Sequence, residues 1–203
     1  MAIFIRNALA GLAALALAWP LQAGAAAPAQ EPIQLDAQSS ELDYGTNQLL
    51  FKKVKITQGA MSITADQAHA TGLDFENSHW EFTGDVKINM EQGRLTSDEA
   101  DATFNKKLLA KVLITGKPAA FEQNNAPAGK SPVHGHADSI DYNIAKGIVH
   151  LAGNAWLSDG QTEIRHESLT YSVPDRKMVA DASEQSSQRV HITITPPPAG
   201  PKP

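Results

Sequence analysis

The sequence predicts an all-β protein, and three observations support this fold class. Beyond residue 30, no stretch has the apolar spacing of an amphipathic helix. Gly and Asn interrupt the chain at short intervals, which is typical of turns between short strands. Apolar and polar residues alternate with the period of two that a half-buried strand requires. The alternating runs are PIQLDA, LLFKKVKITQG, AMSITADQAHA, HWEFTGDVKINMEQG, RLTSDEADATF, KVLITGKPAAFEQ, VHGHADSIDYNI, GIVHLAGNAWLSDG, EIRHESLTYSV, KMVADA and RVHITIT.

The clearest alternation covers residues 80–90. One face of the expected strand carries the apolar or small residues Trp80, Phe82, Gly84, Val86, Ile88 and Met90. The opposite face carries Glu81, Thr83, Asp85, Lys87 and Asn89. The pattern alone leaves open whether the apolar face packs on an ordinary core or on an apolar ligand.

The runs also resemble one another. Three copies of a small residue followed by Asp each precede an apolar–x–Gly step, and the Asp and Gly are fifteen to eighteen residues apart. The pairs are Asp66 with Gly84, Asp98 with Gly116, and Asp138 with Gly153. A strand pair that cannot cover its own apolar face must stack on copies of itself, so the repeat indicates a sheet built from repeated strand pairs.

The first residues are typical of a secretory signal peptide. Arg6 precedes an apolar run at residues 8–18, and Pro20 and several small residues follow it. The expected cleavage sites follow Ala23, Ala25 or Ala27. A retained membrane anchor is the alternative, but the apolar run is shorter than the roughly 20 residues of a spanning helix. We therefore expect residues 1–27 to be cleaved and the mature protein to lie in the periplasm.

Composition limits the remaining possibilities. The 203 residues include no cysteine, which excludes disulfides and thiolate metal sites. Residues 31–195 suit one domain, and the proline-rich residues 196–203 are expected to be a disordered tail. With 17 basic against 22 acidic residues, the chain is a poor candidate for binding nucleic acid. The lysine-rich run at residues 51–55 indicates an exposed sheet edge.

The sequence predicts no catalytic residues, no metal site and no cofactor. His134, His136 and Asp138 would share one face of a strand, but a metal site would need a further ligand such as His150 or His166. We interpret these side chains as polar residues on a solvated face. No G-x-S-x-G, phosphate-loop or Rossmann motif is present.

Several segments, in order, resemble the OstA-like periplasmic lipopolysaccharide-transport proteins, specifically the LptA family of bridge components. They are Pro32–Asp36, Lys55–Gly59, Gly116–Gln123, Gly135–Tyr142, Ala145–Lys146, Leu151–Leu157 and Arg176–Met178. The resemblance covers about residues 31–195. It implies a single twisted antiparallel sheet folded into an open-ended β-jellyroll. It also implies lipopolysaccharide (lipid A) as cargo, head-to-tail contact with other copies, and jellyroll partners at the inner and outer membranes.

By alternation, and with the support of this resemblance, we expect a set of apolar side chains to face a lipid-binding groove. Each buried CH₂ group of an acyl chain is worth about 0.8 kcal/mol, so several chains could bind without a basic patch. The expected groove residues are Ile33, Leu35, Val54, Ile56, Ile63, Phe82, Val86, Ile88, Phe121, Tyr142, Ile144 and Leu157.

Three other functions remain open at the level of the sequence. The chain could be an inner-membrane-anchored jellyroll partner of the same pathway, if residues 1–27 are retained. It could be an envelope glycan hydrolase that uses Asp66, Asp98 and Asp138 as paired acids, although an active site seldom repeats. It could also be a purely structural β-solenoid.

Overall fold

The computed structural model describes residues 31–43, 45–46, 48–71, 74–124, 126, 128–180 and 189–195. The predicted signal peptide (1–27) and tail (196–203) lie outside the described residues. Within the described ranges, no helix is long and apolar enough to cross a bilayer. The strands are β1 (Gln34–Asp36), β2 (Ser39–Asp43), β3 (Gln48–Gln58), β4 (Met61–Thr71), β5 (His79–Asn89), β6 (Gly93–Asn105), β7 (Leu108–Gln123), β8 (His134–Asn143), β9 (Ile148–Ser158), β10 (Thr162–Ser172), β11 (Lys177–Ala180) and β12 (His191–Ile194).

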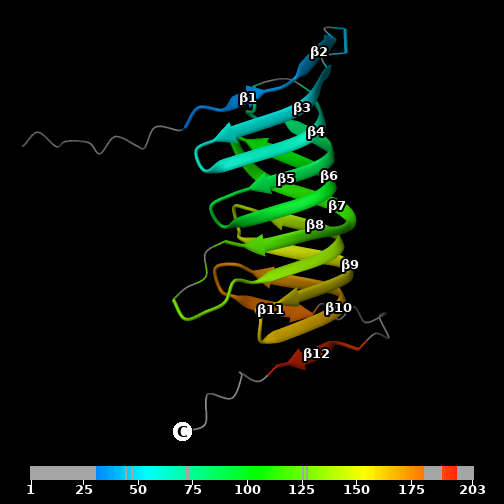
Figure 1. Ribbon diagram of the computed structural model, residues 1–203. Helices are drawn as coiled ribbons and strands as arrows, with labels where there is room; N and C mark the ends of the chain where they lie inside the picture. Colours follow the sequence, from blue (N-terminus) through cyan, green and yellow to red (C-terminus); the bar gives the residue numbers. More distant parts are fainter. Residues whose placement is uncertain are drawn as a thin grey trace, which may run out of the picture. The chain divides into compact units, whose positions relative to one another are not determined.

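All of these strands belong to one antiparallel sheet. From β3 to β11 each strand pairs with the next one along the chain, and Figure 1 shows this succession of hairpins from cyan to orange. The short strands β1 and β2 share the outer edge of β3, and β11 and β12 share the outer edge of β10. Both edges of the sheet therefore consist of two short strands.

The expected alternation is confirmed in β5. Trp80, Phe82, Val86 and Ile88 are at most 1% exposed, whereas the side chains between them lie on the solvated face. The lysine-rich run, in contrast, is not at a sheet edge. It belongs to β3, which pairs with β4 on one side and with β1 and β2 on the other. That prediction was wrong because the period of two identifies the face of a residue but not the lateral neighbours of its strand.

The strands β4 to β8 and β10 each have a register shift near the middle, and these irregularities lie side by side. We call this line the crease. The register shifts occur between Thr64 and Gln67 in β4, Thr83 and Val86 in β5, Thr96 and Glu99 in β6, Thr115 and Ala119 in β7, His136 and Ser139 in β8, and His166 and Ser168 in β10. A bulge bends its strand, so an aligned series of bulges folds the whole sheet along one line.

The repeated Asp and Gly residues meet at the crease. A Cβ atom on Gly84 would lie 2.8 Å from the Asp66 side chain, and one on Gly153 would lie 2.5 Å from Asp138 Oδ2. Both glycines have φ near +75–79°, a region that residues with a Cβ avoid. Lys53 pairs with the Asp66 carboxylate at 2.6 Å. In these two copies the Asp–Gly contact lies at the bend of its strand pair. In the third copy Gly116 has no positive φ, and it approaches the Asp98 backbone and not the Asp98 side chain.

The bend brings opposite ends of the strands together. Gln58 Nε2, at the end of β3, donates to the Lys107 carbonyl oxygen in the β6–β7 turn at 2.9 Å. Tyr171 Oη, near the end of β10, donates to Gln123 Oε1 at the end of β7 at 3.0 Å. An 11-residue strand spans about 35 Å when flat, so these contacts require a sheet that folds back on itself. The predicted jellyroll, a single folded antiparallel sheet, is confirmed.

The crease gives a direct mutational test. Gly84→Ala should lower the free energy of unfolding by about 3 kcal/mol, because strain at positive φ adds to a clash with Asp66. Gly129→Ala is the matched control: φ is +76°, but among the described residues no atom beyond the two chain neighbours lies within 4 Å of the added Cβ. It should cost about 1 kcal/mol. Equal losses in urea denaturation would contradict a specific role for the Asp–Gly contact.

Candidate lipid-binding interior

The inner faces of the folded sheet form one continuous apolar cluster. All twelve expected groove residues belong to it or pack against it. Nine are at most 2% exposed: Val54, Ile56, Ile63, Phe82, Val86, Ile88, Phe121, Tyr142 and Leu157. Ile33, Leu35 and Ile144 are partly buried against the same cluster. Their inward orientation is as predicted, and the binding of lipid by these residues stays a prediction.

Aromatic side chains concentrate in one part of the interior. Trp80 stacks on Phe75 at 4.9 Å between ring centroids and on Phe51 at 5.8 Å, and Phe104 meets Phe75 edge-on at 4.9 Å. The expected groove set omits Phe75 and Phe104. Alternation in the run at residues 94–104 could have identified Phe104, which lies on β6. Phe75 lies outside the strands with φ of 53°, so no periodic pattern points to it.

Two of the buried polar side chains lie at the rim of the interior, whereas His166, also less than 9% exposed, lies in the middle of β10. Gln58 and Gln123, each less than 9% exposed, lie at strand ends. Burial is the main cause that raises the pKa of the Tyr142 and Tyr171 hydroxyls. Among the described residues, no buried side-chain polar atom lacks a hydrogen-bond partner. Such an interior suits aliphatic chains and excludes a charged headgroup, which would have to stay outside.

Hydrogen bonds close the interior where the strand ends meet. We call this line of contacts the seam; it comprises Gln58 with Lys107, Gln123 with Tyr171, and Arg176 with Gln123 and Ser131. Arg176 donates to Gln123 Oε1 at 3.4 Å and to the Ser131 carbonyl oxygen at 2.9 Å. Because the inward side chains pack against one another between the half-sheets, separation of the seam contacts would make room for a guest molecule.

His134 and His136 lie on the outer face, where they contact Trp156. Their rings lie 5.1 and 4.9 Å from the Trp156 ring, and Arg165 lies 5.9 Å from its centroid. Burial is the main cause that lowers the pKa of His136, and the charges of Arg165 and His134 add to it. His150 contacts Thr170 instead, so the proposed extra ligand does not join this group.

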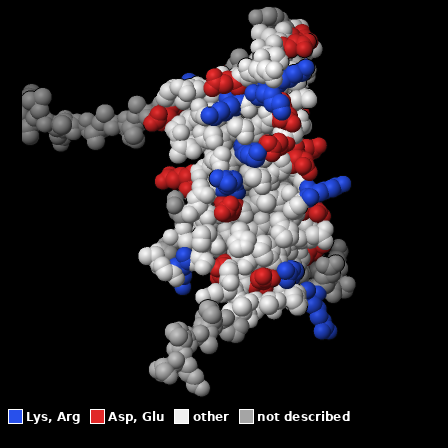
Figure 2. Space-filling view, viewed as in Figure 1, with Lys and Arg blue, Asp and Glu red and all other residues white. Residues whose placement is uncertain are grey.

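The repeated aspartates also have structural partners. Asp98 Oδ2 accepts a hydrogen bond from the Lys117 backbone N–H at 3.2 Å, and Asp138 Oδ2 accepts one from Asn154 Nδ2 at 2.9 Å. Both residues line a shallow hollow of about 520 Å³ at the crease. Their contacts explain the repeat through strand bending, without paired-acid chemistry. Figure 2 shows acidic and basic side chains interspersed over the outer face in view.

Comparison with known proteins identifies relatives of this architecture. Residues 67–177 match the family described as "LptA/(LptD N-terminal domain) LPS transport protein". The chain is 32% identical over 142 residues to the lipopolysaccharide export system protein LptA of Escherichia coli K12, covering 69% of this chain and 73% of that protein. LptA of Shigella flexneri matches to the same extent.

A solved structure supports the fold. The crystal structure of LptH from Pseudomonas aeruginosa, described as the LptA-homologous periplasmic component of a lipopolysaccharide transport device, matches with a TM-score of 0.52. The match covers 82% of this chain and 96% of LptH, at 20% sequence identity. From the family match and the identity to LptA, we conclude that this chain belongs to the LptA/LptD N-terminal domain family of lipopolysaccharide transport proteins.

Proposed function

We propose that this protein is a periplasmic carrier that binds lipopolysaccharide through its acyl chains and passes it from the inner toward the outer membrane. The chain belongs to a family of transport proteins, and this supports the transport of lipopolysaccharide without any chemical change to it. The periplasmic location rests on the predicted signal peptide and on the description of LptH as a periplasmic component. The observation that carries the proposal is the continuous apolar interior.

Acyl-chain burial supplies the driving force. Each CH₂ group that leaves water contributes about 0.8 kcal/mol, and a lipid chain that replaces packed side chains gains part of this amount. The inward side chains of the two half-sheets pack against each other, so lipid binding would exchange one apolar contact for another. Such an exchange keeps affinity moderate, which suits a protein that must also release its cargo.

Partners would bind at the two edges of the sheet. The exposed strands β1–β2 and β11–β12 leave backbone groups that a strand from another protein could pair with. We infer head-to-tail contact between copies, and similar contacts with jellyroll partners at the two membranes. The outer residues Ile192 and Ile194, 54% and 72% exposed, add apolar surface at one of these edges.

Site-specific crosslinking tests the groove. A photo-crosslinker at Ile88, which is fully buried, should label lipopolysaccharide in cells, whereas one at Lys87 on the opposite face should not. Ile88→Asp should cut lipid binding sharply and lower stability by several kcal/mol, because it buries an unpaired carboxylate. Ile88→Met conserves apolar volume and should bind normally. Equal labelling at both positions, or labelling at neither, would contradict the proposal that Ile88 faces the lipid and Lys87 faces away from it.

Removal of the Arg176 guanidinium group tests whether the seam limits the entry of lipid. Arg176→Met keeps the aliphatic stem but loses the hydrogen bonds to Gln123 and Ser131, so the seam should open more readily. We expect lipid uptake up to about tenfold faster in stopped-flow fluorescence, with a loss of about 1–2 kcal/mol in the free energy of unfolding.

Arg94→Met is the matched control, because Arg94 Nε donates to Asn89 Oδ1 at 2.9 Å and Arg94 makes none of the hydrogen bonds that define the seam, although it lies near Gln123. An unchanged uptake rate in the Arg176 variant, or an equal change in the control, would show that the seam does not limit entry.

Sedimentation tests the edge contacts. The intact mature chain should form larger assemblies as its concentration rises, whereas a chain that ends at about residue 174 lacks β11 and β12 and should associate more weakly. The shortened chain should keep most of the sheet folded by circular dichroism. A strict monomer at high concentration for the intact chain would rule out self-association through these edges.

A further inference from the structure

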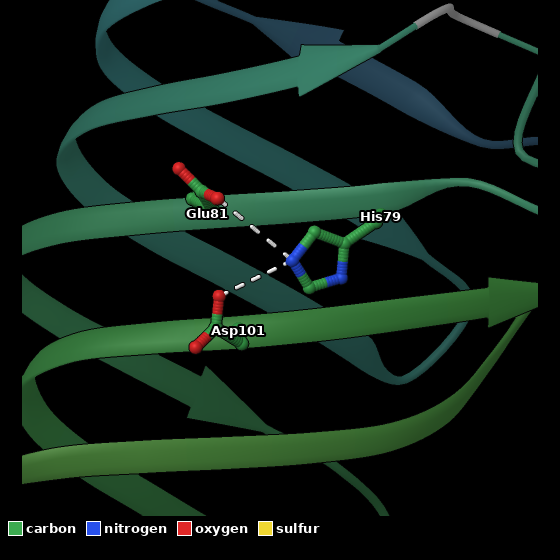
Figure 3. Close-up of side chains that lie close together, drawn as sticks. All are labelled: His79, Glu81 and Asp101. Carbon is green, nitrogen blue, oxygen red and sulfur yellow. Dashed lines mark ion pairs between the residues drawn. The ribbon is translucent and has the colours of Figure 1, made fainter.

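Four side chains outside the lipid interior converge on the outer face of β4, β5 and β6. Figure 3 shows Glu81 and Asp101 directed toward the same ring nitrogen of His79. His79 Nε2 lies 3.3 Å from Asp101 Oδ1 and 4.0 Å from Glu81 Oε1. The other Glu81 oxygen, Oε2, lies 3.5 Å from His69 Nδ1 on β4. These side chains come from three neighbouring strands, so the sheet fixes their spacing.

A cation between the carboxylates of Glu81 and Asp101 would relieve the repulsion between them. Glu81 and Asp101 are directly opposite each other in the β5–β6 register, and like charges at opposed positions destabilise a sheet. A protonated His79 could direct its single Nε2–H proton to one carboxylate at a time. Lys111 lines the same shallow hollow as His79 and Asp101, but its ammonium group pairs with Asp141 at 2.8 Å.

The donor set matches a divalent transition metal. We propose that His79, Glu81 and Asp101 bind one zinc ion, and that water completes its coordination. The donor atoms of the three residues lie within 4.8 Å of one another. Bonds of about 2.0–2.2 Å in a tetrahedral site require donor atoms roughly 3.3–3.5 Å apart. His79 and Asp101 already meet this requirement at 3.3 Å, and the 4.0 Å between His79 and Glu81 would close by a small side-chain movement. An imidazole among the ligands favours zinc over magnesium or calcium, which prefer oxygen ligands alone.

An ion in this position would link β5 and β6 on their solvated face. All four side chains are between 38% and 57% exposed, so an ion could reach them without any opening of the sheet. The site lies on the opposite face of β5 from Trp80 and Phe82, and it is therefore separate from the lipid interior.

Calorimetric titration of the untagged mature protein with zinc chloride at pH 7.5 tests the proposal. We expect one ion per chain with an affinity on the order of micromolar, and a rise of about 5 °C in the melting temperature at a hundredfold excess over the dissociation constant. His79→Gln and Asp101→Asn should each weaken binding at least thirtyfold, whereas His69→Gln, which lies outside the group of three, should change it little. Millimolar magnesium should not compete.

The double variant His134→Gln/His136→Gln is the control, because it removes two histidines that contact Trp156 on a different part of the outer face. It should bind zinc as the parent does. All variants change exposed or half-exposed residues, and their melting temperatures without zinc should match the parent. Absence of stoichiometric zinc, unchanged binding in His79→Gln, loss in the control, or equal competition by magnesium would each overturn the proposal.

Discussion

A sheet with one apolar face must cover that face, and within the described residues this chain supplies neither a helix nor a second sheet to do so. The sheet therefore covers itself. The Asp–Gly contacts between Asp66 and Gly84 and between Asp138 and Gly153 bend the strands at matching positions. The hydrogen bonds of Gln58, Gln123 and Arg176 then join the ends that the bend brings together. The interior, the crease and the seam are consequences of one requirement.

The same requirement explains how a packed core could also serve as a binding site. In an ordinary globular protein, the elements around the core cannot separate without global unfolding. Here the two faces of the interior belong to halves of one sheet, and the crease holds them together continuously while the seam uses a few hydrogen bonds. Separation at the seam would expose apolar surface and leave the strand ladders intact. An acyl chain could then take the place of the opposite half-sheet.

In this protein the sequence pattern predicts well on which face of the sheet a side chain lies. It predicts poorly which strands and side chains lie next to one another. Alternation placed Ile56, Ile88 and Leu157 inside because strand geometry leaves only two directions for a side chain. It could not show that β3 has partners on both sides. It also could not bring His69, Glu81 and Asp101 together, since that depends on the register of three strands. The repeated aspartates were visible in the sequence, but their contact with glycine depends on backbone geometry at the crease.

Native mass spectrometry of the mature protein, purified from the periplasm of a lipopolysaccharide-producing cell, tests most directly whether the interior holds acyl chains. A bound species with the mass of lipopolysaccharide or lipid A is expected in the parent protein and in Ile88→Met. This species should be lost in a folded Ile88→Asp variant. A parent protein free of lipid, or lipid retained equally by a folded Ile88→Asp variant, would contradict the claim that the folded sheet holds acyl chains in its interior.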